Sequence, residues 1–186
     1  HTRCSQGGRR RRQARHRVPF PSPDWVEKID MNIRCICNDS DIAAVAAVFT
    51  ASVHELGASH YDATQRNAWA ARFADVKAWS ARLSGLRTLL AIEKNEIVGF
   101  ISYEPNGHIE FLYTAPGVER QGVASALYRE VEKELPGVSL FTEASLAAKP
   151  FFMQHGFTVV EWVDVVLLKL ARCLDTQNTE LLSKEL

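Results

Sequence analysis

The chain has 186 residues, of which 46% are hydrophobic and 24% charged, and its formal net charge is zero. These values are typical of one globular domain with a real core, and no run approaches eighteen unbroken apolar residues, so neither a transmembrane helix nor a membrane partner is expected. The zero net charge hides an asymmetry: residues 1–30 carry eight basic and three acidic side chains, whereas residues 31–186 carry fourteen basic and nineteen acidic ones.

The first thirty residues form a distinct segment rich in Arg and Pro. Arg9–Arg12 show no apolar periodicity, and three prolines between residues 19 and 23 leave no room for a helix. We interpret residues 1–30 as a disordered leader, non-native or translated from upstream of Met31, with an Arg-rich targeting segment or a nucleic-acid-binding arm as alternatives. Residues 31–186 are then expected to form a single domain, for which nucleic acid is not the favoured partner.

The cysteines do not form a metal-ligand spacing. Cys35 and Cys37 lie two residues apart on a predicted strand, where they share a face but are too close along the chain for an easy disulfide. With Cys4 and Cys173 they are expected to be reduced thiols, which indicates a cytoplasmic protein without a bound metal.

Helix-start signals and β-rich runs divide the first half of the domain. Asn38, Asp62 and Asp75 each precede a predicted helix as N-cap residues. Two β-rich runs separated by a polar turn then predict a hairpin. The expected elements are a strand at 33–37, helices at 38–57, 62–72 and 75–83, hairpin strands at 86–93 and 97–104, and a third strand at about 108–114.

Helices and strands alternate in the second half. An amphipathic stripe after Gly122 predicts a helix that a Pro-Gly pair stops, and Ser145 begins a further helix in which Pro150 is tolerated near the first turn. The tail from Leu167 fits either a strand or a helix and is a candidate homodimer contact. The whole order predicts an α/β fold, with one mixed sheet of about six to seven strands and helices on both faces. The expected elements are a helix at 122–135, a strand at 138–142, a helix at 145–156, a strand at 157–166 and a candidate last strand at 179–186.

Residues 109–125 are the most informative part of the sequence. An alternating apolar strand ends at Pro116-Gly117, and a short loop containing Gly122 leads directly into a helix without an acidic N-cap. The free N–H groups and the dipole of a helix N-terminus favour negative charge. This segment therefore predicts a site for a phosphate-bearing ligand.

A second motif, TEASLAAKPFFMQHGF, occupies residues 142–157. Together with the loop at 119–124 and the element order, it resembles the GNAT superfamily of acyl-CoA-dependent N-acyltransferases. Its Glu-Ala-Ser and Ala-Lys-Pro-Phe-Phe segments are similar to those of a bacterial subgroup of acetyltransferases. The segment 61–69 also resembles the substrate-side helix of that subgroup. The matches span about residues 31–162.

The resemblance implies acetyl-CoA as the cosubstrate, held between two splayed parallel strands. The backbone of the strand ending at Thr114 would pair with the pantetheine arm like an added strand, and the N–H groups of the following loop would hold the pyrophosphate. The implied cofactor contacts on these two segments are Leu112, Tyr113, Thr114, Arg120, Gln121, Gly122, Val123, Ala124 and Ser125.

Three positions depart from the family's usual pattern. Glu119 stands where Arg or Gln is usual, so it is not carried over as a contact. Ser145 and Phe152 stand in the places of an Asn and a Tyr near the cofactor. Ser145 either hydrogen-bonds cofactor amides or caps its helix. Phe152 cannot supply the proton that the Tyr of many relatives is thought to give to the departing thiolate.

Acetyl transfer to an amine needs a group that takes the amine proton. Glu110 lies on the strand expected to line the cleft, at the place where several relatives carry a Glu base, and His108 shares its face and titrates near physiological pH. Tyr61, Trp69 and Tyr103 are expected to wall the acceptor pocket, since aromatic walls suit an amphipathic or cationic amine.

Two functions follow from the resemblance. The leading one is an N-acetyltransferase that moves the acetyl group from acetyl-CoA directly to a primary amine of a small molecule or peptide. The alternative is a non-catalytic acyl-CoA-binding module, suggested by Glu119 and Phe152. The motifs do not select the acceptor, because one fold serves many acceptors.

Overall fold

A computed structural model describes residues 31–71, 75–162 and 167–172. The predicted leader, the candidate strand at 179–186, Cys4 and Cys173 all lie outside these residues. The described elements in chain order are β1 (Asn32–Cys35), α1 (Asp39–Glu55), the 3₁₀ helix η1 (Leu56–Ser59), α2 (Ala63–Ala71), α3 (Val76–Leu83), β2 (Arg87–Glu93), β3 (Glu96–Tyr103), β4 (Ile109–Thr114), α4 (Val123–Glu134), β5 (Leu140–Ser145), α5 (Lys149–Gln154), β6 (Thr158–Trp162) and β7 (Leu167–Arg172).

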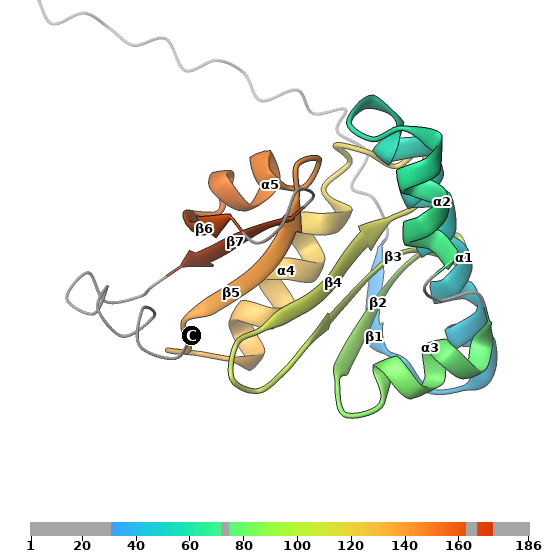
Figure 1. Cartoon of the computed structure of the whole chain (residues 1–186). Coiled ribbons are helices and arrows are strands. Elements are labelled where there is room, and N and C mark those ends of the chain that lie inside the picture. The colour runs from blue at the N-terminus through green and yellow to red at the C-terminus, as the bar shows by residue number, and fades with distance from the viewer. Residues whose placement is uncertain (1–30, 72–74, 163–166, 173–186) are drawn as a thin grey trace, which may run out of the picture.

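The strands form two antiparallel sheets that meet at β4 and β5 (Figure 1). The first sheet has the order β1-β2-β3-β4, and the second has the order β5-β7-β6. A parallel bridge between His108 and Phe141 joins them. This confirms the predicted α/β architecture of six to seven strands and adds that the sheet divides between β4 and β5.

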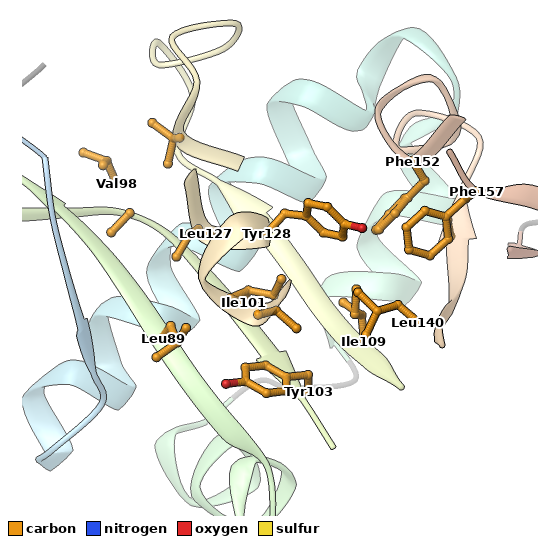
Figure 2. Packing of buried hydrophobic residues seen from close by; sticks show 14 residues of the cluster. Leu89, Val98, Ile101, Tyr103, Ile109, Leu127, Tyr128, Leu140, Phe152 and Phe157 are labelled. Atoms are coloured by element: carbon orange, nitrogen blue, oxygen red, sulfur yellow. The ribbon is translucent and has the colours of Figure 1, made fainter. Parts of the chain in front are cut away.

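Helices cover both faces of the first sheet, because the strands alternate their apolar side chains. Leu89 and Ile101 point to the face covered by α4, where the buried cluster of Figure 2 also includes Leu127. Leu90 and Phe100 point to the other face, where they pack with buried side chains of α1 and α3. The two clusters fix α4 and the pair α1 and α3 on opposite sides of β4.

The predicted helix starts are confirmed by their capping hydrogen bonds. The Asn38 side chain accepts from the Asp41 N–H, and the Asp75 carboxylate accepts from the Ala78 N–H. Asp62 and Gln65 exchange two side-chain-to-backbone bonds of 2.8 and 3.0 Å ahead of α2. Such bonds satisfy donors that a helix N-terminus leaves open.

One expectation about the second sheet is corrected, and one open assignment is resolved. Ser145 does not begin a helix: β5 continues through Ser145, and α5 starts only at Lys149. The cause is the strand β7 at Leu167–Arg172, which the sequence left unassigned and which pairs with β5 along its whole length. This long-range pairing overrides the helix-start preference of a local serine.

The segment Asp39–Ser59 is long and apolar enough to cross a membrane by length and composition alone. The sequence criterion of unbroken apolar runs therefore missed it. In the structure, Val45, Phe49 and Val53 of this helix are buried against the first sheet. One face of the segment is thus packed in the core, and 33% of its apolar window is buried.

Gly107 holds the two sheets together and is a sensitive position. Its backbone has φ +96°, and a Cβ atom there would lie 2.2 Å from the Ser139 carbonyl oxygen. We expect Gly107→Ala to lower the free energy of unfolding by about 1–3 kcal/mol more than Gly137→Ala in urea titrations, because only the first adds a backbone clash. Gly137 also has a positive φ, +81°, but open space at its Cβ. Equal losses would contradict this account of the junction.

Candidate active site

β4 and β5 pair at one end and separate at the other. The Phe141 N–H donates to the Gly107 carbonyl at 3.1 Å, and the Thr142 hydroxyl donates to the Ile109 carbonyl at 2.8 Å. Beyond these bonds, toward Thr114 and Ser145, a cavity of about 200 Å³ lies between the strand ends. The divergence of two neighbouring parallel strands thus creates the site.

The cavity brings together many of the residues predicted for the site. Leu112, Tyr113 and Thr114 of β4, Ala124 of α4 and Ser145 of β5 line one part, as expected for cofactor contacts. A second part comes from helical segments and includes the predicted acceptor residues Tyr61 and Trp69. Lining residues that the sequence did not single out are Ser52, Val53, Leu56, Gly57, Ala147, Ala148 and Phe151.

The loop before α4 leaves the helix N-terminus open. Gly122 is the N-cap, with φ +87° and no side-chain capping bond, and the first bond within the helix runs from the Ala126 N–H to the Gly122 carbonyl at 2.9 Å. The N–H groups of Val123, Ala124 and Ser125 therefore precede the helical ladder. No atom lies within 4 Å of where a Gly122 Cβ would be, so the space above this turn is clear.

Two polar side chains of this loop bind the loop itself. The Glu119 carboxylate accepts from the Gly117 N–H at 3.0 Å, and the Gln121 amide donates to the Gly117 carbonyl at 2.9 Å. The Glu119 side chain is thus directed to the preceding turn. Arg120 is the cationic side chain of this loop. It is exposed, and its φ is +61°.

A β-bulge shapes the chemical end of β4. Ser102 pairs with Phe111 and Tyr103 pairs with Ile109, so Glu110 is the extra residue. Bulges re-aim side chains and are frequent near active sites. Here the bulge carries the Glu110 carboxylate into an ion pair with Arg82 of α3, whose guanidinium also lies over the Phe111 ring at 5.7 Å.

His108 lies beside Glu110 within a group of carboxylates. Its Nε2 is 2.8 Å from a Glu143 oxygen, and its Nδ1 is 3.7 Å from oxygens of both Glu104 and Glu110. The hydrogen bond with Glu143 raises the pKa of His108 above 6.5, against the opposing effect of burial. Among the described residues, no group of His, Cys, Asp and Glu is arranged to hold a metal ion.

Comparisons with known proteins agree on one family. Residues 57–165 match the model of the acetyltransferase (GNAT) domain. The chain belongs to the GNAT acetyltransferase family. The uncharacterized N-acetyltransferase YafP of Escherichia coli is 35% identical over 121 residues, which cover 65% of this chain and 77% of YafP.

Solved structures show the same GNAT fold. The GCN5-related N-acetyltransferase of Rhodopseudomonas palustris is 29% identical, with a TM-score of 0.72 over 77% of this chain and 95% of that one. The PaiA N-acetyltransferase of Thermoplasma acidophilum, solved in complex with coenzyme A, is 18% identical, with a TM-score of 0.65 over 77% and 98% of the two chains. The family resemblance read from the sequence motifs is confirmed.

Several predicted site residues of this GNAT domain do not line the cavity. They are the predicted catalytic residues Glu110 and His108, the loop residues Arg120, Gln121, Gly122, Val123 and Ser125, and the two aromatic residues Tyr103 and Phe152. The two aromatic residues are buried in the core. Tyr103 is 1% exposed in the core, and its hydroxyl donates to Glu134, so it does not wall the cavity (Figure 2). Phe152 is 2% exposed and packs against Phe157, whereas the neighbouring Phe151 lines the cavity. The helix start at Lys149, four residues later than expected, sets which of the two phenylalanines faces inward.

Sequence reasoning missed two polar residues that contact the predicted catalytic pair of this GNAT domain. Arg82 pairs with Glu110, and Glu143 hydrogen-bonds to His108. Glu143 stands inside the late motif, next to the Ala-Ser pair, so its alternation with buried Thr142 and Ala144 is a signal that it faces the cleft side of β5. Nothing local marks Arg82, because its partner lies on another element.

Glu143→Gln should lower the pKa of His108, because the Glu143 bond is the main cause of its rise. NMR titration of the imidazole measures this directly, with Glu161→Gln on β6 as the control. A folded pKa raised above 6.5 stabilises the protein below the unfolded value, and this stabilisation is lost as the pH rises through the folded pKa. Glu143→Gln should therefore destabilise the protein more at pH 5.5 than at pH 9. An unchanged His108 pKa in Glu143→Gln would contradict the assignment of the Glu143 hydrogen bond as the main cause of the raised pKa.

Proposed function

We propose that this protein transfers the acetyl group of acetyl-CoA directly to a primary amine. The observation that carries the proposal is a cavity between the diverging ends of β4 and β5 that includes Ala124 in the open first turn of α4. Its GNAT family membership supports acetyl transfer. Two solved structures of the same fold, PaiA and yncA of Salmonella typhimurium, contain coenzyme A and acetyl-CoA respectively.

The residues present fit such a cosubstrate. The N–H groups of Val123, Ala124 and Ser125, with the Arg120 side chain, would bind the pyrophosphate at the helix N-terminus. The β4 edge at Leu112–Thr114 would pair with the amides of the pantetheine arm. Ser145, at the end of β5, lines the opposite side of the cavity.

The chemistry needs a base, a polarised carbonyl and a proton for the leaving thiolate. Glu110, positioned by Arg82 and beside His108, would take the amine proton as the new C–N bond forms. A backbone N–H of β4 would polarise the thioester carbonyl, which is worth about 3 kcal/mol for one such donor. The C–S bond then breaks, and water would protonate the thiolate, because Phe152 has no hydroxyl and is buried in the core.

A non-catalytic acyl-CoA-binding module is the second candidate. It is favoured by the Glu110–Arg82 ion pair, which occupies the proposed base. Calorimetric binding of acetyl-CoA, followed by thiol detection of CoA release over an amine panel, separates the two. We expect binding and amine-dependent release. Tight binding without release for any amine would assign the module, and no binding would contradict both.

The sequence predictions of a cytoplasmic location, a homodimer and a single domain over 31–186 stay predictions. They do not enter the proposed mechanism. The mechanism uses residues of one chain: those that line the cavity, and Glu110 and His108, which are not part of its lining.

A further inference from the structure

The acceptor side of the cavity offers no charged side chain. It is built from the end of α1, from η1 and from the region of α2, and none of the described residues that line the cavity is Asp, Glu, Lys or Arg. Arg66 donates to the Tyr61 carbonyl and has a buried Nε without a hydrogen-bond partner, but it does not line the cavity. A second ionised group seated among the lining residues would therefore lose water without contacting a charge of opposite sign there.

Aromatic and aliphatic side chains supply most of this wall. The rings of Tyr61 and Trp69 meet edge to face, with centroids 5.5 Å apart and an interplanar angle of 85°. Val53 and Leu56 add aliphatic surface beside them. Such a wall binds a ring through apolar burial and edge-to-face contacts.

The Tyr61 ring is held in place from outside the acceptor side. Its hydroxyl accepts from the Leu146 N–H at 2.9 Å, which links the segment before α2 to the loop after β5. The ring is 6% exposed. Because this aromatic wall is fixed, little side-chain entropy is lost when a ligand binds to it. A fixed wall therefore favours a ligand of matching shape over a flexible polar ligand.

The size of the cavity limits the acceptor further. A cavity of about 150 Å³ accepts benzene. The whole cavity here is about 200 Å³ and must also take the acetyl end of the cosubstrate. Room is left inside for about one ring and its amine, and a larger acceptor such as an aminoglycoside or a peptide would have to extend out of the open side of the cavity.

We infer that the acceptor is a compact primary amine on an uncharged, ring-bearing apolar body, seated against Trp69 and Tyr61. This inference rests on the proposed acetyl transfer. It separates the enzyme from those that would acetylate polyamines, amino acids or protein lysines, each of which brings a further charge or a larger body.

A matched acceptor series tests the inference. Phenethylamine, phenylalanine amide and phenylalanine share one ring and one amine, and only the last adds a carboxylate. We expect kcat/KM to fall at least 100-fold from phenethylamine to phenylalanine. From phenethylamine to the equally bulky phenylalanine amide, log(kcat/KM) should fall by less than half as much. Comparing kcat/KM for hexylamine with that for 1,6-diaminohexane tests the effect of a second cation on the acceptor. A preference for phenylalanine, the diamine or spermidine would overturn the inference while leaving acetyl transfer intact.

Variants of the wall provide the second arm. Trp69→Ala should raise KM for phenethylamine at least tenfold and leave the Kd for acetyl-CoA within twofold, and Trp69→Phe should restore most of the loss. Met153→Ala, on the exposed face of α5, is the control. An unchanged KM in Trp69→Ala would overturn the placement of the acceptor. If the proposed function itself is wrong, the unaltered protein will release no CoA with any amine, which distinguishes that outcome from a wrong acceptor.

Discussion

Gly122→Glu is expected to abolish measurable acetyl-CoA binding, a loss of more than 100-fold in affinity. The substitution places a side chain in the clear space above the N-terminal turn of α4 and adds a negative charge where the helix dipole and free N–H groups would bind pyrophosphate. It also imposes a left-handed conformation on a non-glycine residue, which costs about 1–2 kcal/mol. Isothermal titration calorimetry measures the effect.

Gly85 provides a matched control for backbone strain. Its φ is +88°, close to the +87° of Gly122, and its Cβ position is equally open, but it lies between α3 and β2, away from the cavity. Gly85→Glu should lose similar stability and keep its acetyl-CoA affinity. Gly122→Ala should fall between the unaltered protein and Gly122→Glu, because it adds strain without charge. Tight binding by Gly122→Glu would refute the loop as the phosphate site.

Glu110→Gln should lower kcat by a factor of 10² to 10⁴ while the Kd for acetyl-CoA stays within about twofold. A general base contributes a factor of this size, and Glu110 is not among the residues that line the cavity, so acetyl-CoA should lose no direct contact. Steady-state rates across pH measure the effect. The loss should be largest at neutral and acidic pH, where the amine most needs a base.

Two further variants make this result specific. Glu130→Gln removes an ion-paired carboxylate of the α4 surface, bonded to Lys133 at 2.7 Å, and should leave kcat unchanged. Arg82→Met removes the partner of Glu110 and should shift the pH–rate profile rather than erase activity. A Glu110→Gln enzyme with the unaltered profile would eliminate Glu110 and leave His108 as the base to test.

The sequence predicted the first sheet well because its signals are local. Caps at Asn38, Asp62 and Asp75 and the polar turn at Lys94-Asn95 lie next to the elements they define. The second sheet was harder to predict, because β5 extends through Ser145 only by pairing with β7, more than twenty residues further along the chain. A long-range partner leaves no mark in a local pattern.

The site divides in the same way. The loop before α4 and the β4 edge were predicted from motifs as cofactor contacts, and the structure places Leu112, Tyr113, Thr114, Ala124 and Ser145 around one cavity. Arg82 could not be predicted, since its role depends on how α3 packs against a bulge in β4. The prediction for Tyr103 was wrong because its ring is buried in the core cluster that α4 covers, and nothing in the local strand pattern shows this.

The separation of β4 from β5 would also couple the stability of this protein to its proposed cosubstrate. In the described part of the chain, β4 has a strand partner on its β5 side only at the His108–Phe141 bridge. With the proposed cosubstrate as the missing strand, a concentration of 100 times its Kd would add about 2.7 kcal/mol to the free energy of unfolding. Starved cells would then hold a larger unfolded fraction of this enzyme, so proteolysis would adjust its abundance to the acetyl-CoA supply.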